Sequence, residues 1–382
     1  MKYFLIAGEA SGDLHGSNLM RGLYAEDPQA QMRFWGGPLM DAVCRERSGE
    51  SGLLHDYSEG AVIGFFELLP KLRKLIGNLR ACKEDILAWK PDVVILIDYP
   101  GFNFRIAEFA HKRGFKVFYY IAPKVWATRE YRVKKIKAFV DKLFIVFPFE
   151  KEYFDRKGVS YIYKGNPLID AVDGAVVEPR ASLLGSLGWP DGPYIALLAG
   201  SRAGEVASMM KVMMAFADLL HGTPGYEDFR FVVAGAPSRC AADYAPYIAG
   251  RDYVRVVFGK TYSILSGAEA AVINSGTASL EAVLFGTPQV VGYVASPLTV
   301  PLARGMIRIK YVSLGNLIAG RTVFRELLQY YFTPENVCEE VRHILEDKAY
   351  RERMLAGYDE IRALLGGKGA SAATARAMIE NL

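Results

Sequence analysis

Carboxylates stand directly after several apolar runs of this chain, where they could act on a ligand. Asp98 follows the run Val93–Ile97, which predicts a buried strand. A carboxylate at the end of such a strand is partly desolvated and suited to act as a general base, although it could also cap the helix expected near Phe102. Glu9 and Asp13 follow the first apolar run in the same way and are further candidates for catalysis or for capping.

A second group of residues could bind a phosphorylated ligand. Ser275, Gly276 and Thr277 form a turn between an apolar run and a predicted helix. A helix start presents backbone N–H groups and a positive end to an anion. Glu281, one helical turn beyond Thr277, would face the same ligand and would suit the hydroxyls of a ribose. For the turn alone, an ordinary capped helix is an equally good interpretation.

Arg202 and Asn316 could complete this phosphate site. Arg202 follows a Gly-Ser turn at the start of another predicted helix, where a guanidinium can bind a phosphate through two parallel hydrogen bonds. The structural alternative is a salt bridge to Glu205, which we expect to be weaker because both residues lie in one turn. Asn316 lies in an apolar loop that contains a glycine and could close over the ligand.

The remaining candidates suit an acceptor that is partly apolar. Trp126 and Arg129 follow a predicted strand and offer an aromatic ring and a cation, while Ser11 and Asn103 lie in the loops of Glu9 and Asp98. Apolar side chains beside basic ones also suit acyl chains and a membrane surface. Core packing is the alternative for this last set, which comprises Phe65, Phe66, Leu69, Met209 and Met210.

Parallel strands are expected to position these side chains, because strand-like apolar runs alternate with amphipathic segments along the chain. A segment rich in Gly and Pro at 173–193 separates two series of such runs and predicts a linker between domains at 1–172 and 194–354. The predicted strands are Tyr3–Ala7, Met32–Trp35, Val93–Ile97, Lys116–Ile121 and Lys142–Val146 in the first series, and Tyr194–Leu198, Arg230–Ala234, Val254–Phe258, Ala270–Ile273 and Gln289–Val291 in the second.

This pattern predicts an α/β protein with two Rossmann-like domains that face each other across a ligand cleft. The dinucleotide fingerprint G-x-G-x-x-G is missing from both halves, which argues against a nicotinamide or flavin dehydrogenase. The four cysteines form no CxxC pair and the five histidines have no HExxH spacing, so we expect no metal site and a reducing cytoplasm.

The length and composition narrow the classes further. A chain of 382 residues is too long for one ordinary core, and 51% hydrophobic with 23% charged residues is typical of a soluble protein. No apolar run reaches the roughly 18–20 residues that cross a bilayer. Basic residues gather at 71–83 and 129–137, but no nucleic-acid-binding motif accompanies them. Anionic lipid headgroups or a solvated helix face remain as interpretations.

The chain resembles the lipid-A-disaccharide synthases over nearly its whole length. The segments that carry the resemblance in the first half are AGEASGDLHG at 7–16, DYPGFNFRIA at 98–107, APKVWATR at 122–129, FPFE at 147–150 and GNPLID at 165–170. In the second half they are GSR at 200–202, NSGTASLEAVLFGTPQVVGY at 274–293 and YVSLGNLIAGR at 311–321.

The resemblance implies a GT-B fold and an inverting glycosyltransferase that needs no metal or other cofactor. Such enzymes join UDP-2,3-diacylglucosamine to 2,3-diacylglucosamine 1-phosphate (lipid X), forming a β(1→6) disaccharide and UDP. The resemblance implies Asp98 as the base, with Glu9 as a supporting or rival carboxylate. The implied UDP side comprises Arg202, Ser275, Gly276, Thr277, Glu281 and Asn316.

The implied partners are acylated glucosamine lipids and the inner face of the cytoplasmic membrane, which the enzyme would contact peripherally; a homodimer is possible. The helices at 355–382 are expected to pack back on the first domain, as they often do in GT-B folds. Asn166 stands where the family usually has His, which argues against a catalytic role for that position. Alternatives are a related UDP-sugar transferase or epimerase with a soluble substrate, and a non-catalytic nucleotide-sugar or lipid-binding protein.

Overall fold

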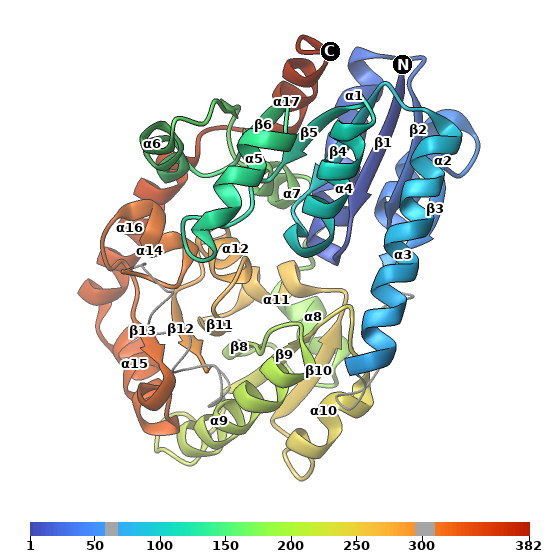
Figure 1. Ribbon diagram of the computed structural model, residues 1–382. Helices are drawn as coiled ribbons and strands as arrows, with labels where there is room; N and C mark the ends of the chain where they lie inside the picture. The colour runs from blue at the N-terminus through green and yellow to red at the C-terminus, as the bar shows by residue number, and fades with distance from the viewer. Residues whose placement is uncertain (58–67, 295–309) are drawn as a thin grey trace. The chain divides into compact units, whose positions relative to one another are not determined.

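The computed structural model describes residues 1–57, 68–294 and 310–382, and these form two compact units (Figure 1). Unit 1 comprises Met1–Ala171 together with Gly367–Leu382, and unit 2 comprises Val172–Gly366. Each unit contains one sheet, and every strand pairing in both sheets is parallel among the described residues. The predicted α/β class with parallel sheets is therefore confirmed.

The sheet of unit 1 has seven strands in the order β3-β2-β1-β4-β5-β6-β7. The two central strands, β1 and β4, are apolar on both faces because helices cover a parallel sheet on both sides. All five strands predicted in this half are present, and β3 and β7 are additional. The strands are β1 Lys2–Ala7, β2 Gln31–Gly36, β3 Leu53–Asp56, β4 Val93–Ile97, β5 Lys116–Tyr120, β6 Lys142–Ile145 and β7 Ile162–Tyr163.

The helices of unit 1 include one from the end of the chain, α17, which packs along α1 (Figure 1). Their close approach depends on Gly22, where a Cβ atom would lie 2.8 Å from Cβ of Ala375. Asp170 fixes the start of α17 by accepting hydrogen bonds from the backbone N–H groups of Gly369 and Ser371. The helices are α1 Ala10–Glu26, α2 Pro38–Ser48, α3 Leu68–Trp89, α4 Pro100–Lys112, η2 Glu130–Arg132, α5 Val133–Phe139, α6 Pro148–Lys157, α7 Pro167–Asp173 and α17 Ala370–Ile379.

The sheet of unit 2 has six strands in the order β10-β9-β8-β11-β12-β13. Its strands are β8 Tyr194–Leu198, β9 Arg230–Gly235, β10 Val254–Phe258, β11 Ala270–Asn274, β12 Gln289–Tyr293 and β13 Glu326–Leu328. Its helices are α8 Arg180–Ser186, α9 Ala203–His221, α10 Ala241–Ile248, α11 Thr261–Gly267, α12 Ala278–Phe285, α14 Leu314–Ala319, η3 Gln329–Tyr331, α15 Pro334–Glu346 and α16 Lys348–Leu365. Among the helices that the structure describes, none is long and apolar enough to span a bilayer.

The first boundary between the units, after Ala171, lies one residue from the predicted one, and the end of the chain packs on unit 1 as expected, but two other predicted bounds differ. The expected linker at 173–193 contains α8, whose Leu183 and Leu184 are buried in the core of unit 2. The tail expected from residue 355 begins inside α16, which packs on α12 and α14 of unit 2, and the chain returns to unit 1 only after Gly366.

Candidate active site

Asp98 lies at the carboxyl end of β4 in a strained turn of unit 1. Its φ angle is 43°, and the φ angle of Tyr99 is 46°. Each non-glycine residue in this left-handed region costs roughly 1–2 kcal/mol, and such strain persists only where the surroundings impose it. Asp98 is half-buried, so its carboxylate lies at the carboxyl ends of the parallel strands, in a conformation that the surroundings impose.

Hydrogen bonds to the backbone impose that conformation. The carbonyl oxygen of Asp98 accepts one bond from Asn103 Nδ2 at 2.8 Å and another from the Tyr119 hydroxyl at 2.6 Å. Asn103 Nδ2 also donates to the carbonyl oxygen of Ile97 at 3.3 Å, and the N–H of Asp98 donates to Tyr120. Asn103 was predicted to contact the acceptor, but its exposed fraction is 0%, so that prediction is corrected: its side chain holds the turn.

The loop after β1 meets this turn. A Cβ atom on Gly8 would lie 2.3 Å from the ring of Tyr99, so only glycine admits the ring at this position. Burial raises the pKa of the Tyr99 hydroxyl, and the nearby charge of Glu9 raises it further. Glu9, at the end of this loop, and Ser11, in the first turn of α1, are exposed. The structure therefore brings Glu9 and Tyr99 together beside Asp98.

Asp13 is not available for catalysis. It is buried, and its two carboxylate oxygens accept hydrogen bonds from the backbone N–H groups of Leu39 and Met40, each at 3.0 Å. It therefore caps the start of α2, a neighbouring helix in the fold rather than its own. Burial raises the pKa of the Asp13 carboxyl, while these backbone bonds act in the opposite direction. The prediction of a catalytic Asp13 is corrected to a structural cap.

Trp126 lies in the loop after β5, and a carboxylate that the sequence analysis did not single out holds it. Its Nε1 donates to Oε1 of Glu150 at 3.1 Å, and the other oxygen of Glu150 accepts bonds from Val146 and Phe147 N–H groups. Burial raises the pKa of the Glu150 carboxyl to about 7. Arg129, at the far end of the loop, is exposed and has a φ angle of 56°.

In unit 2, two predicted phosphate-binding loops lie against each other. They follow β8 and β11, which are adjacent strands. A Cβ atom on Gly200 would lie 2.4 Å from Nδ2 of Asn274 and 2.6 Å from Oε2 of Glu205, and its φ angle is 96°. The loop that contains Arg202 and the turn that contains Ser275 therefore share one edge of the sheet.

The salt bridge that the sequence analysis considered the weaker alternative does form. Arg202 donates to Oε1 of Glu205 at 2.9 Å, because residues three apart at a helix start lie on one face. The guanidinium remains open to solvent, with 69% of its side chain exposed. The loop of Arg202 lies against the turn of Ser275, since Gly200 approaches Asn274.

The Ser-Gly-Thr turn leads into α12. Its first backbone N–H groups point out of the helix start, as at any helix N-terminus. Ser275 Oγ donates to the carbonyl oxygen of Val312 at 3.0 Å, and Thr277 occupies the N-cap position with no hydrogen bond from its side chain to the helix. Glu281 is half-buried, and burial raises the pKa of its carboxyl to about 7.

Asn316 braces a loop and does not face a ligand. Its exposed fraction is 0%; its Nδ2 donates to Phe324 and Glu326, and its Oδ1 accepts from the N–H of Val323 at 2.8 Å. The prediction that it contacts UDP is corrected for this reason. Asn166 is likewise a brace, donating to Val146 and accepting from the N–H of Leu168.

The predicted lipid-contacting residues differ in outcome. Met209 and Met210 are buried in the core face of α9, so the prediction of a lipid contact is corrected to core packing. Phe65 and Phe66 lie outside the described residues. Leu69 lies in α3, but its side chain is outside the description.

Solved structures similar in fold are enzymes and binders of UDP-sugars. The UDP-GlcNAc 2-epimerase from Neisseria meningitidis bound to UDP-GlcNAc is 14% identical, with a TM-score of 0.69 and full coverage of both chains. A putative UDP-N-acetylglucosamine 2-epimerase from Listeria monocytogenes is 16% identical, with a TM-score of 0.65, over 100% of this chain and 96% of that one. At these identities the likeness establishes the fold alone, which is the GT-B type that the resemblance implied.

Comparison of sequences is more specific. A sequence model described as Lipid-A-disaccharide synthetase matches residues 3–378. The Lipid-A-disaccharide synthase of Geobacter metallireducens is 37% identical over 383 residues, which are 100% of this chain and 97% of the relative. The protein of the same name from Pseudomonas fluorescens is 37% identical over 96% of this chain and 94% of its own length. The chain therefore belongs to the lipid-A-disaccharide synthetase family.

Proposed function

We propose that this protein joins UDP-2,3-diacylglucosamine to 2,3-diacylglucosamine 1-phosphate, forming a β(1→6)-linked disaccharide 1-phosphate and UDP. The observation that carries the proposal is the match over the whole chain to relatives named Lipid-A-disaccharide synthase.

Asp98 is the general base of the proposed reaction. Its carboxylate accepts the proton of the acceptor 6-hydroxyl while that oxygen attacks the anomeric carbon on the face opposite the diphosphate. The new C–O bond forms as the bond to the UDP oxygen breaks, so the configuration inverts. The half-buried position of Asp98 and its fixed backbone support this role, because a base acts efficiently when it is held in reach of the proton.

The turn Ser275–Thr277 and Arg202 receive the departing diphosphate. The start of α12 supplies N–H groups and a positive end, and the exposed guanidinium of Arg202 exchanges its bond to Glu205 for a phosphate oxygen. Charge that develops on the leaving group is thereby stabilised without a metal in this proposal. Glu281, one turn into the same helix, accepts hydrogen bonds from the ribose.

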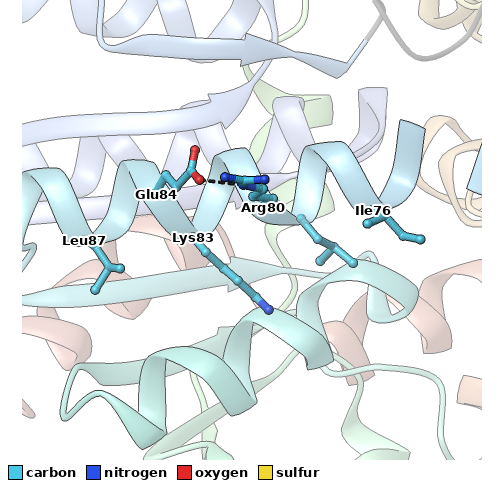
Figure 2. Close-up of a pocket in the computed structure, with 6 residues that line it drawn as sticks. Ile76, Arg80, Lys83, Glu84 and Leu87 are labelled. Carbon is cyan, nitrogen blue, oxygen red and sulfur yellow. Dashed lines mark hydrogen bonds and ion pairs between the residues drawn. The ribbon is translucent and has the colours of Figure 1, made fainter. Parts of the chain in front are cut away.

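A face of α3 supports peripheral contact with the inner face of the cytoplasmic membrane. Four successive turns of this helix line a groove of about 380 Å³ (Figure 2). Ile76 and Leu87 are 58% and 37% exposed there. Arg80 and Lys83 lie between them, with Arg80 paired to Glu84 at 2.8 Å. Exposed apolar side chains beside cations favour an anionic lipid surface.

The test supplies the purified protein with both acylated substrates and measures UDP release and disaccharide formation by mass spectrometry. Asp98→Asn is expected to reduce turnover by about 10²–10⁴-fold, the usual contribution of a general base, while UDP affinity stays within about twofold. Asp92→Asn is the matched control: Asp92 lies just before the other end of β4, where it accepts the N–H of Lys2, and turnover is expected to persist. Absence of disaccharide with the wild-type protein would refute the proposal.

A further inference from the structure

Tyr262 touches the helix that carries Glu281 in two ways. Its hydroxyl donates a hydrogen bond to Oε1 of Glu281 at 3.3 Å. Its ring packs on Phe285 with the ring centroids 5.1 Å apart, one turn further along α12. Tyr262 lies on α11, so the contact joins two neighbouring helices. No motif in the sequence pointed to this residue.

The helix that carries Tyr262 is itself anchored on several sides. The Tyr194 hydroxyl donates to the carbonyl oxygen of Ile264 at 2.7 Å, and Thr287 Oγ1 donates to that of Leu265 at 2.8 Å. Ser263 Oγ accepts the N–H of Glu178 at 3.0 Å. The position of the Tyr262 hydroxyl is therefore set before any ligand arrives. A glutamate side chain has several rotatable bonds, and ordering them when a ligand binds costs conformational entropy. A fixed hydrogen-bond donor orders the side chain before the ligand arrives and so lowers this cost.

The surroundings of Glu281 offer little else to orient a carboxylate. Among the described residues, α12 contacts α11, α14, α16, β11 and β12. Of the ionisable groups on these elements, Arg362 of α16 is bonded to Asp359 and to the carbonyl oxygen of Leu284, and Lys260, just before α11, is bonded to Glu178. Tyr293 lies on β12 and Tyr358 on α16, where Tyr358 donates to the carbonyl oxygen of Thr287. The other ionisable groups of α16 are Lys348, Tyr350, Arg351, Glu352, Arg353 and Glu360. Burial raises the pKa of Glu281 to about 7, and the bond from Tyr262 acts against that rise.

We propose that Tyr262 is a positioning residue that holds the Glu281 carboxylate in the orientation needed to accept hydrogen bonds from the ribose of a bound nucleoside diphosphate. One carboxylate oxygen takes the tyrosine hydroxyl, and the other is left to the ribose. The inference rests on the proposed role of Glu281 in UDP binding. It goes beyond that role in assigning a second residue through which the nucleotide is recognised.

The experiment measures binding of UDP and of 2′,3′-dideoxy-UDP by isothermal titration calorimetry. Tyr262→Phe removes the hydroxyl and keeps the ring on Phe285. We expect it to weaken UDP binding by roughly three- to tenfold, the range of one hydrogen bond, and to leave dideoxy-UDP binding unchanged. Tyr253→Phe is the matched control. Tyr253 lies just before the start of β10, whereas Tyr262 lies beyond its end, and the Tyr253 hydroxyl donates to the Asp218 carboxylate. Removing this hydroxyl should change the binding of neither nucleotide.

A pH series separates positioning from general damage to the fold. UDP binding by the wild type is expected to strengthen as the pH rises through about 7, because Glu281 must lose its proton to accept from the ribose. Tyr262→Phe should move this midpoint to higher pH, and Glu281→Gln, whose side chain does not titrate, should remove the pH dependence of the difference between the two nucleotides. The diphosphate titrates equally in both ligands, so it cancels in the comparison.

The outcomes distinguish this inference from the function on which it rests. If the wild type prefers UDP to dideoxy-UDP but Tyr262→Phe weakens both equally or neither, the positioning role is overturned and the ribose role of Glu281 stands. If the wild type binds both nucleotides equally, the ribose assignment of Glu281 falls, and this inference falls with it. If the expected pattern appears but no disaccharide is formed, the inference stands and the proposed reaction is refuted.

Discussion

Asn103→Ala tests whether the strained turn at Asp98 is held by one buried amide. Asn103 Nδ2 bonds the carbonyl oxygens of Ile97 and Asp98, and it shares the second of these acceptors with Tyr119. Removing the amide leaves the Tyr119 hydroxyl as the remaining side-chain donor to this turn in the described structure. The Asn103 side chain is fully buried, so the substitution changes no exposed surface.

The expected loss of stability is small. Two hydrogen bonds of about 1 kcal/mol each are lost, but Asn103 Oδ1 is buried without a partner among the described residues, and deleting it returns on the order of 1 kcal/mol. We therefore expect the free energy of unfolding to fall by about 1 kcal/mol. The left-handed conformations of Asp98 and Tyr99 together store roughly 2–4 kcal/mol, which exceeds what the single bond from Tyr119 can oppose.

The turn should relax, and activity should fall more than stability does. A displacement of about 1 Å at a reacting group can cost on the order of 10²-fold in rate, so we expect kcat to fall by about 10–100-fold. Urea unfolding and steady-state turnover measure the two quantities. Asn166→Ala is the control, since this buried amide also bonds backbone groups in unit 1, at Val146 and Leu168 and not in the turn of Asp98. Turnover of Asn103→Ala within threefold of wild type, or an equal loss in Asn166→Ala, would refute the reasoning.

Two further predictions concern other residues of the candidate site. Gly200→Ala places a side chain on a residue whose φ angle is 96°, with its Cβ atom 2.4 Å from Asn274. It should therefore destabilise unit 2 by at least about 1–2 kcal/mol and weaken UDP binding. Thermal unfolding with and without UDP measures both effects, and an unchanged unfolding midpoint would contradict this prediction. Glu150 has a pKa of about 7 in the folded protein against 4.5 ordinarily, so its contribution to stability is lost as the pH rises from about 4.5 to 7. The unfolding free energy of the wild type is expected to fall between pH 5 and pH 8, and Glu150→Gln should make this fall smaller by up to about 3 kcal/mol. If the variant loses as much stability over this range as the wild type, Glu150 is not the cause of the loss.

Most of the strands that the sequence predicted lie inside their sheets, although one of them, Val254–Phe258, is an edge strand. Val93–Ile97 and Tyr194–Leu198 are apolar throughout, so their boundaries coincide with prediction. The strands that it missed, Leu53–Asp56, Ile162–Tyr163 and Glu326–Leu328, are the outermost strands of their sheets or very short. An edge strand has one neighbour and need not be apolar on both faces, so hydrophobic periodicity reveals it only when it is long and largely apolar, as Val254–Phe258 is.

The candidate site could be predicted in position but not in the role of each polar residue. The loops of Asp98 and Ser275 follow strand ends, and the topology of parallel sheets places such loops at one edge. Asp13, Asn103 and Asn316 lie near the starts of α1, α4 and α14, yet their side chains satisfy buried backbone groups. A polar residue near a helix start suits either purpose, and only the three-dimensional partners distinguish them.

Residues that act through another residue are harder still to find. Glu150 reads as a helix cap, because it stands two positions after Pro148 at the start of α6. Its bond to Trp126 comes from a different loop, 24 residues away in the sequence. No spacing rule relates two such positions, since the sheet and not the local chain brings them together.

The helix α17 has a consequence for the order in which the protein can fold during synthesis. The last helix completes the first unit: it covers α1, and Asp170 holds its start. A ribosome makes residues 1–171 and then all of unit 2 before it makes residues 370–379. The nascent first unit must therefore wait with one face of α1 uncovered while the second unit emerges and folds. Chaperone dependence should be concentrated in that interval, and a chain released before residue 370 would keep this surface exposed.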